Sequence, residues 1–363
     1  MFVLVGKRGP KGIFLDSISG IVVPSRNRGA IQMTLAELQE ALLGLNSYQM
    51  DKVSDQVMSY MQLNRELSQT RPTFCPICND ENNHFIKKGF LRGKQRYLCK
   101  SCGHKFVYDV NQLTSHSHQS VDAWVTVIED TLSMVPLDET AEKIDVHHET
   151  AFNMRHKLLV YLEDMIAGAK PLDELIEADE TYVLNSRKGV KVPDRKARKH
   201  GEGASKPGLS DELYCVCVAT DRNNNLFAEC VNRAKPSGDD LVAALGTRLI
   251  SGSTILCDGA KSYNKLADFT NCKKVELVGH ETYDKVQHLN TVNGVHSRFK
   301  EMIRQYKGVA SRYLNRYLAL LSVIVSFCGK TTAEAGHELR NKLRTVRDNV
   351  TYASSQTTGL LEI

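Results

Sequence analysis

Two pairs of cysteines constrain this chain more than any other feature. Cys75 and Cys78 form one pair, Cys99 and Cys102 form the other, and twenty residues separate the pairs. Zinc prefers a tetrahedron of soft ligands, and two C-x2-C pairs supply all four thiolates. A module of this size has too small a core to fold alone, so bound metal would supply the missing folding free energy. The spacing predicts a zinc ribbon over residues 74–106.

Aromatic and basic residues occupy much of the predicted ribbon. Its small core is expected to contain the aromatic side chains Phe74, Phe85, Phe90, Tyr97 and Phe106. Residues 87–105 include no acidic residue and seven basic ones, which are Lys87, Lys88, Arg92, Lys94, Arg96, Lys100 and Lys105. Clustered positive charge is typical of contacts to DNA phosphates, although a solvated hairpin can have the same composition. We interpret this cluster as a DNA-binding surface.

Composition narrows the class of protein. The 363 residues suggest two or three domains, and no apolar run approaches the roughly 20 residues that a membrane helix requires. The net charge of +5 permits a nucleic-acid partner without demanding one. Ten cysteines are too sparse for a disulfide scaffold, and most of those outside the ribbon are expected to be small buried side chains: Cys215, Cys217, Cys230, Cys257, Cys272 and Cys328. With no recognisable signal peptide, we expect a cytoplasmic protein.

The residues before the ribbon fall into two parts. Residues 1–33 show no sustained periodicity, and we expect a disordered or non-native leader there, with the natural protein beginning at Met33. A helical pattern starts at Thr34, which forms a capping box with Glu37 and precedes leucines at helical spacing. A helical N-terminal segment is therefore predicted over residues 34–70.

Residues 120–165 show the pattern of a helix-turn-helix. The second helix is expected to begin near His148 and to bury Ala151, Phe152 and Leu158. Its outward polar face would then carry His148, Glu149, Asn153, His156 and Lys157. Of these we select His148, Asn153 and Lys157 as candidate DNA contacts. An ordinary amphipathic helical hairpin is the alternative interpretation.

From about residue 172 the pattern changes to short β-like runs, two of which hold an acid. Asp179 lies within the run IEADETYVL, and Asp258 ends the run STILCD. Burying a carboxylate in an apolar strand costs free energy unless the carboxylate binds a ligand or partner. The alternative is that these acids lie at strand ends or in turns, as Asp258 before a glycine could. A later helix opens with Asn290 and Asn293. Two strand carboxylates and an oxygen ligand from this helix suit Mg²⁺, so Asp179, Asp258 and a group of the helix are predicted to hold a metal for catalytic phosphoryl transfer.

A basic, glycine-rich segment lies between the first two β-like runs. Residues 187–206 have no apolar periodicity and are expected to form an exposed hairpin loop. Arg195 and Lys196 within it are candidate phosphate contacts.

The order of these elements predicts the fold. A strand with an acid, a hairpin, a helix, a strand with a second acid and a helix with the third group is the RNase H-like order. We therefore expect a multidomain α+β chain. It consists of a helical leader, a zinc ribbon, a helix-turn-helix, an RNase H-like α/β catalytic domain over 172–330, and a C-terminal helix and tail over 331–363.

The ordered motifs resemble insertion-sequence transposases of the DDE type that carry an N-terminal zinc ribbon, and above all the family named fifteen-ninety-five. The motifs span about 74–328 and are FCPIC with CKSCGHKF, ADETYV, CDGAKSY, HLNTVNGVHSRFK and YKGVASRYLNRYL. The resemblance implies that Asp179 and Asp258 are catalytic acids. It places the third catalytic position on Asn293, where many relatives have glutamate. Some branches of the family resemble this chain in using asparagine there, followed seven residues later by lysine, which is Lys300 here. It also implies Mg²⁺, transposon terminal inverted repeats and target DNA as substrates, and a homodimer or larger assembly on DNA.

The asparagine gives this site one negative charge fewer than a site with three acids. Glu177 lies two residues before Asp179 on the same strand face, so it is the alternative third ligand, whereas Glu180 faces the other way. Lys300 shares a helix face with Asn293 and is placed to meet a phosphate. We expect a transposase that cleaves DNA by metal-dependent hydrolysis and joins the 3′-OH to target DNA. A non-catalytic DNA-binding regulator and a metal-dependent nuclease of the same fold are the alternatives.

Overall fold

The computed structural model describes residues 84–91, 94–107, 112–114, 117–189, 203–277 and 285–343. It also describes short stretches and single residues, namely 3–4, 21–24, 30–33, 43–44, 46–48, 50, 72, 75, 77–78, 355 and 361. The chain divides into two units, Met1–Arg71 and Pro72–Ile363, and each is described by itself. Among the helices of the described residues, none has the length and apolar character needed to cross a bilayer.

The first unit contains a small antiparallel sheet. Its strands are β1 (Val3–Leu4), β2 (Ile21–Pro24) and β3 (Ala30–Met33), in that order. The sequence predicted no regular structure in this segment. The strands are rich in β-branched residues, but none exceeds four residues, which is too short for an alternating pattern to stand out. The helical segment predicted over 34–70 lies almost entirely outside the described residues.

The cysteine module is a three-stranded antiparallel sheet. Its strands are β4 (Phe85–Leu91), β5 (Lys94–Cys99) and β6 (Lys105–Val107). Phe106 forms its centre, with its ring centroid 5.7 Å from that of Phe85 and 6.2 Å from that of Tyr97. The prediction that Phe90 joins this core is wrong, because its side chain is 68% exposed. β6 pairs only with residues 96–98, so it leaves the hairpin end that holds Phe90 uncovered; Phe74 lies outside the described residues.

A helical region follows the cysteine module. It comprises the 3₁₀ turn η2 (Gln112–Thr114) and helices α3 (Val121–Leu132), α4 (Leu137–Lys143) and α5 (His148–Ala167). The turn between α4 and α5 places Asp145 at a φ of 53°, and the N–H of Val146 donates to the Ala141 carbonyl at 3.1 Å. The second helix begins at His148, as the pattern predicted, and Ala151 on it is fully buried.

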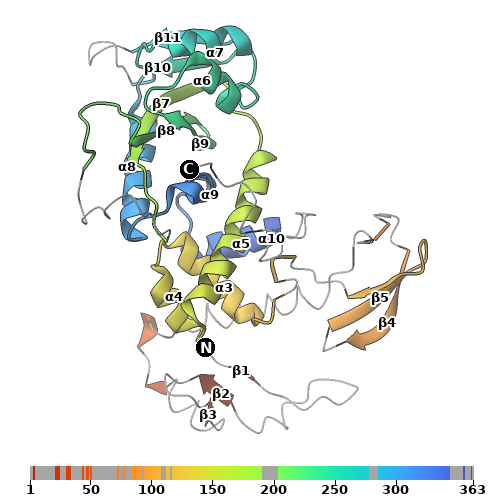
Figure 1. Ribbon diagram of the computed structural model, residues 1–363. Helices are drawn as coiled ribbons and strands as arrows, with labels where there is room; N and C mark the ends of the chain where they lie inside the picture. Colours follow the sequence, from red (N-terminus) through yellow and green to blue (C-terminus); the bar gives the residue numbers. More distant parts are fainter. Residues whose placement is uncertain are drawn as a thin grey trace. The chain divides into compact units, whose positions relative to one another are not determined.

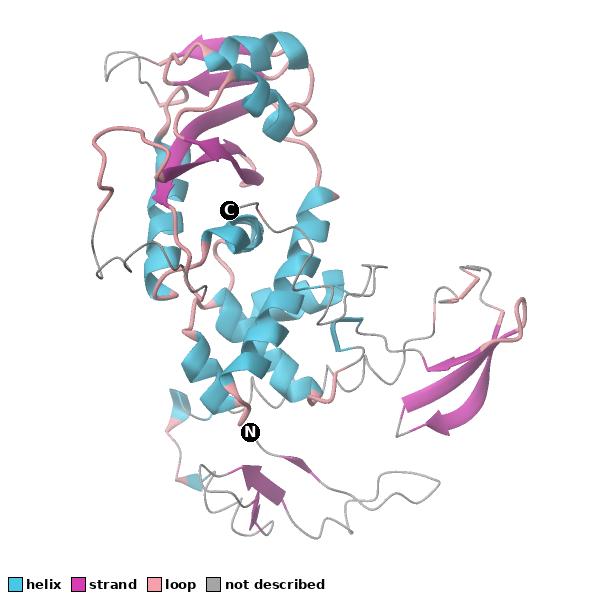
Figure 2. Ribbon diagram, viewed as in Figure 1, coloured by secondary structure: helices cyan, strands magenta, loops and turns pink. Residues whose placement is uncertain are grey.

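A mixed five-stranded sheet organises the rest of the second unit. Its strands are β7 (Leu175–Leu184), β8 (Leu213–Asp221), β9 (Leu226–Arg233), β10 (Thr254–Cys257) and β11 (Lys273–Glu276), and their spatial order is β11-β10-β7-β8-β9. β7, β8 and β9 form an antiparallel meander, whereas β10 and β11 run parallel to β7. The basic segment joins β7 to β8. These described elements follow the order predicted from the sequence. Figure 2 shows the strands of this sheet together with the helices around them.

Helices cover both faces of this sheet. α6 (Gly238–Leu245) and α7 (Ser262–Thr270) pack on one face, around Ile176, Cys217 and Ile255. α8 (Asn290–Gln305) and α9 (Leu314–Ser326) pack on the other, where α8 contacts β7 and α9 contacts α5 (Figure 1). The 3₁₀ turn η4 (Ser311–Tyr313) precedes α9, and α10 (Thr332–Leu343) follows it. Because both faces are covered, nearly every residue of β8 is buried.

The cysteines outside the ribbon divide by position. Four of the six are buried as expected, namely Cys215, Cys217, Cys230 and Cys257. Cys272 is only half-buried and Cys328 is exposed. Both follow the ends of helices instead of lying within strands, which explains the difference.

Candidate active site and metal centre

The two acids predicted to be catalytic lie on, or directly after, neighbouring parallel strands. The register of β10 on β7 pairs Leu256 with Glu177, and each acid follows two residues later along the chain. Asp258 is exposed just beyond the end of β10, and its Oδ1 accepts a hydrogen bond from the N–H of Ala260 at 3.0 Å. Asp179 is more enclosed, with a side chain 21% exposed. We refer to Asp179 and Asp258 as the acid pair.

The surroundings of the acid pair disfavour negative charge. Burial raises the pKa of Asp179 to about 6, a hydrogen bond from the Glu180 backbone opposes this shift, and the charge of Asp258 adds to it. Burial likewise raises the pKa of Glu180 to about 7, and the charges of the acid pair raise it further. Oε1 of Glu180 is buried without a hydrogen-bond partner. A divalent cation at the acid pair would offset this concentration of carboxylates, so the donor set fits a metal that prefers oxygen ligands.

His296 is the residue through which α8 meets the acid pair. Its Nδ1 lies 3.8 Å from Oδ2 of Asp179. Burial lowers the pKa of His296 to about 4, and the nearby Lys300 ammonium lowers it further, so the ring is neutral near pH 7. Its Nε2 is buried without a hydrogen-bond partner. The sequence interpretation missed this residue. Its position three residues after Asn293, among the apolar residues of α8, was the available signal.

Asn293 and Lys300 flank His296 along α8. They lie three residues before it and four residues after it, and both are exposed, in contrast to the buried His296. The backbone carbonyl of Asn293 accepts a hydrogen bond from the Ser297 hydroxyl at 3.1 Å. The structure therefore brings the predicted third ligand and the predicted phosphate contact to the helix that adjoins the acid pair.

Glu177 occupies a different environment from Asp179, although both are on the same strand face. Its side chain is only 1% exposed and forms an ion pair with Arg222. Its carboxylate also accepts hydrogen bonds from the Thr291 hydroxyl at 2.8 Å and the Val292 N–H at 2.9 Å, and it lies 3.1 Å from Nδ1 of His288. These contacts tie β7 to the first turn of α8.

The four ribbon cysteines form a compact cluster. All four sulfur atoms lie within 4.8 Å of one another. The Sγ atoms of Cys75 and Cys102 are 3.7 Å apart, and those of Cys78 and Cys99 are 3.8 Å apart. Four thiolates at the usual Zn–S length of about 2.3 Å in a tetrahedron would be about 3.8 Å apart. Within the described residues, this cluster is the one group of three or more Cys, His, Asp or Glu side chains close enough to share a metal ion.

The predicted DNA contacts of the ribbon are only partly described. Lys87 and Lys88 are exposed on β4, and Arg96 on β5 donates from Nε to the Lys88 carbonyl at 3.3 Å. Lys94 belongs to β5, but its side chain is outside the described part. Arg92 and the two loop candidates Arg195 and Lys196 also lie outside the described residues.

The polar face predicted for α5 is only partly correct. His148 is exposed, with Nε2 3.3 Å from Oδ1 of Asp138, and Asn153 is half-buried. The prediction that Lys157 faces outward is wrong, because it is 1% exposed and its Nζ lies 5.8 Å from the centre of the Trp124 ring.

His156 is also buried, between the rings of Phe152 and Tyr313 at centroid distances of 4.1 and 4.2 Å. The reason is that α3 and α9 both pack against α5, which leaves less surface to solvent than an isolated pair of helices would.

Comparison with known proteins shows which family the five-stranded sheet and its helices resemble. Residues 171–322 match the family described as the ISXO2-like transposase domain. The chain carries a transposase domain of this family. The match confirms the insertion-sequence family that the motifs indicated, and the matched segment of the transposase contains the acid pair and Asn293.

Similar proteins include a relative from an insertion sequence. The uncharacterized protein in transposable element ISH50 of Halobacterium salinarum is 26% identical to the transposase over 251 residues, which cover 68% of this chain and 82% of that protein. The simian T-cell lymphotropic virus intasome in complex with PP2A regulatory subunit B56 gamma matches 47% of this chain and 56% of its own, with 12% identity and a TM-score of 0.28. The pre-cleavage Mos1 transpososome matches over 58% of this chain and 75% of the Mos1 chain, with 11% sequence identity and a TM-score of 0.21.

Proposed function

We propose that this transposase binds the terminal inverted repeats of a transposon, hydrolyses the phosphodiester bond at the transposon end and joins the exposed 3′-OH to target DNA. The observation that carries the proposal is that β7, which holds Asp179, pairs in parallel with β10, which Asp258 directly follows. The charge of Asp258 acts on Asp179, and α8, which holds Asn293, contacts β7. The transposase family of residues 171–322 agrees with this reaction class.

Asp179, Asp258 and Asn293 would hold Mg²⁺ in this proposal. When bound, the ion would stabilise negative charge on the attacking and leaving oxygens of the phosphoryl displacement. The raised pKa of Asp179 supports the assignment, because a group that is costly to ionise beside a second carboxylate gains most from a cation. The exposed Lys300 would meet a DNA phosphate, and Glu177 would position α8 without binding the ion.

The cysteine cluster would bind a structural zinc ion. Two sulfur–sulfur distances, 3.7 and 3.8 Å, match those of a tetrahedral site, and all four sulfur atoms lie within 4.8 Å of one another. The small aromatic core around Phe106 offers little other stabilisation. We further propose that the basic residues of the ribbon and of the 187–206 loop contact DNA phosphates, while His148 and Asn153 contact the transposon end. The protein would act in the cytoplasm, as a homodimer or larger assembly on DNA.

A joining assay tests the proposed reaction. Labelled transposon-end DNA, Mg²⁺ and a target plasmid are incubated with the full-length protein, and cleaved and joined products are counted separately. Asp179→Asn and Asp258→Asn should each abolish both products while leaving end binding intact. Asp268→Asn is the matched control, because Asp268 is an exposed acid on α7 away from the proposed ligands.

Each remaining outcome favours one alternative. A wild-type protein that binds ends but yields no product with Mg²⁺ or Mn²⁺ would favour a non-catalytic regulator. Cleavage without joining would favour a nuclease.

A further inference from the structure

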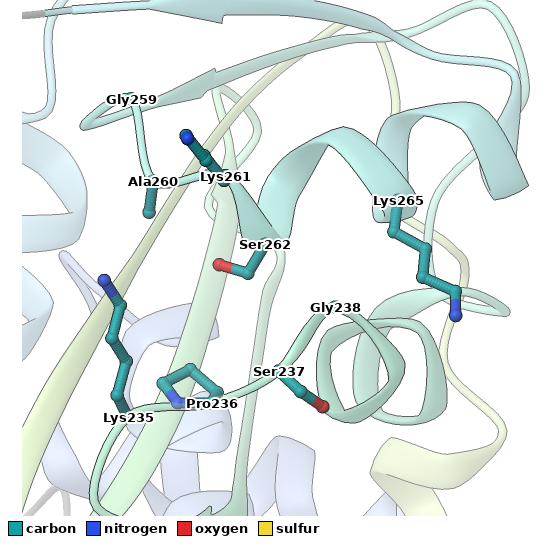
Figure 3. Close-up of a pocket in the computed structure, with 9 residues that line it drawn as sticks. All are labelled: Lys235, Pro236, Ser237, Gly238, Gly259, Ala260, Lys261, Ser262 and Lys265. Carbon is teal, nitrogen blue, oxygen red and sulfur yellow. The ribbon is translucent and has the colours of Figure 1, made fainter.

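A basic pocket begins one residue beyond the acid pair. It has a volume of about 600 Å³ and lies where the chain enters α6 and α7 (Figure 3). One wall is the segment 235–238 and the other is formed by residues 259–262 together with Lys265. The described residues that line it include three lysines and no acid.

The polar groups of this pocket are not equivalent. Lys235 and Lys261 extend their ammonium groups on the same side, and the Ser262 hydroxyl is directed toward the space between them (Figure 3). The Ser262 oxygen is buried and has no hydrogen-bond partner. Lys265 lies on the other side of the pocket, where its Nζ is 2.6 Å from Oδ1 of Asp239. Two cations and one unused hydroxyl are therefore available to a ligand.

The backbone adds to the positive potential of the pocket. The first turns of α6 and α7 both lie at its walls, and helix N-termini carry partial positive charge. The Ser237 and Asp240 side chains already cap α6, so the lysines and Ser262 supply the groups that remain unused. The charge of Lys235 also acts on Glu180, which places the pocket within electrostatic reach of the carboxylates.

We infer that this pocket binds a phosphodiester group of a DNA strand next to the bond that reacts. The ammonium groups of Lys235 and Lys261 would pair with the phosphate oxygens, and the Ser262 hydroxyl would donate a hydrogen bond to one of them. The inference rests on the proposed function, because it takes the acid pair as the place of reaction. The phosphate belongs to the transposon-end strand or to the target strand, which share this chemistry.

The double variant Lys235→Ala/Lys261→Ala tests the pocket. Lys265→Ala is the control, because Lys265 lies on the other side of the pocket in an ion pair with Asp239. The first arm measures affinity for a transposon-end duplex between about 50 and 200 mM salt. Both lysines pair with one phosphate, so their loss should reduce the slope of log K against log salt by about 0.9. The advantage of wild type over the double variant should accordingly shrink about three- to fourfold across this range if the end strand occupies the pocket.

The second arm measures joining of a pre-cleaved end at limiting target concentration. Reduced joining with unchanged end affinity would assign the pocket to the target strand. Ser262→Ala should weaken the same step while leaving Tm unchanged or raised, because the hydroxyl has no partner in the protein. If the double variant matches Lys265→Ala in both arms, the inference is wrong.

The outcomes separate this inference from the proposed function. Wild-type protein that joins DNA while the double variant behaves like Lys265→Ala would refute only the pocket. Wild-type protein that neither cleaves nor joins, but whose salt-dependent DNA binding is reduced by the double variant, would refute only the proposed reaction.

Discussion

Replacing Glu177 should show whether it positions α8 or binds metal. Glu177→Gln keeps the size of the side chain but removes its charge and one acceptor oxygen. The wild-type carboxylate accepts hydrogen bonds from Arg222, the Thr291 hydroxyl and the Val292 N–H. It also lies beside His288. The variant can satisfy only part of this set, so both the strand and the first turn of the helix lose contacts.

The size of the effect follows from burial. Removing one partner of a buried ion pair costs about 3–5 kcal/mol. Arg222 is 30% exposed and can recover some hydration, so we expect the lower end of the range, about 3 kcal/mol. At about 2–4 °C per kcal/mol for a unit of this size, Tm should fall by about 6–12 °C. Glu276→Gln is the control, because Glu276 is 53% exposed in its pair with Lys274, and exposed pairs contribute about 0–1 kcal/mol.

Differential scanning calorimetry measures the loss of stability, and a Mg²⁺ titration of the joining rate measures the loss of function. A positioning role predicts a lower Tm and a lower maximal rate, with the same half-saturating Mg²⁺ concentration. Unchanged Tm together with a much higher Mg²⁺ requirement would refute this reasoning and make Glu177 the third metal ligand.

Three further predictions concern zinc, the third ligand and pH. Cys99→Ser should lose the bound zinc, because three thiolates leave the tetrahedron incomplete; native mass spectrometry checks this, and full retention of zinc would contradict the ribbon site. Asn293→Ala should slow joining about a thousandfold, because loss of a metal ligand removes several kcal/mol of transition-state stabilisation. Asn293→Asp should retain activity. A mild effect of Asn293→Ala on the joining rate would mean that Asn293 binds no metal. Burial raises the pKa of Glu163 to about 7 although Arg316 lies 3.5 Å away, so the folded state holds this proton more tightly than the unfolded state does. The contribution of protonated Glu163 to stability should thus decrease as the pH rises from about 4.5 to 7, and Glu163→Gln should remove that part of the pH dependence of Tm. Identical profiles of Tm against pH for wild type and Glu163→Gln would contradict this prediction.

The features that the sequence predicted well are local or follow from strand geometry. The cysteine spacing predicted which four residues gather, because each C-x2-C pair brings its own two sulfur atoms together. The order of the elements predicted that Asp179 and Asp258 belong to one site, and the parallel pairing of β10 with the first half of β7 brings their two strands together. The helix-turn-helix pattern correctly predicted that the second helix begins near His148.

The features that it missed depend on contacts between distant parts of the chain. Lys157 is buried because α3 and α9 pack around α5, and α9 lies more than 150 residues later in the sequence. The pairing of Glu177 with Arg222 joins residues 45 positions apart. A two-residue period can place a side chain on a face of a strand, but it does not indicate which side chains will neutralise it there.

The partners that each carboxylate meets explain how one strand can carry both a structural carboxylate and a proposed metal ligand. Glu177 and Asp179 share a face of β7, and α8 covers both. The helix meets Glu177 with its first turn, where Arg222 also supplies positive charge. One turn further along it meets Asp179 with His296, whose lowered pKa keeps the ring neutral near pH 7. α8 is thus anchored at one carboxylate and leaves the charge of the other uncompensated beside Asp258, which is where a bound cation would gain the most free energy.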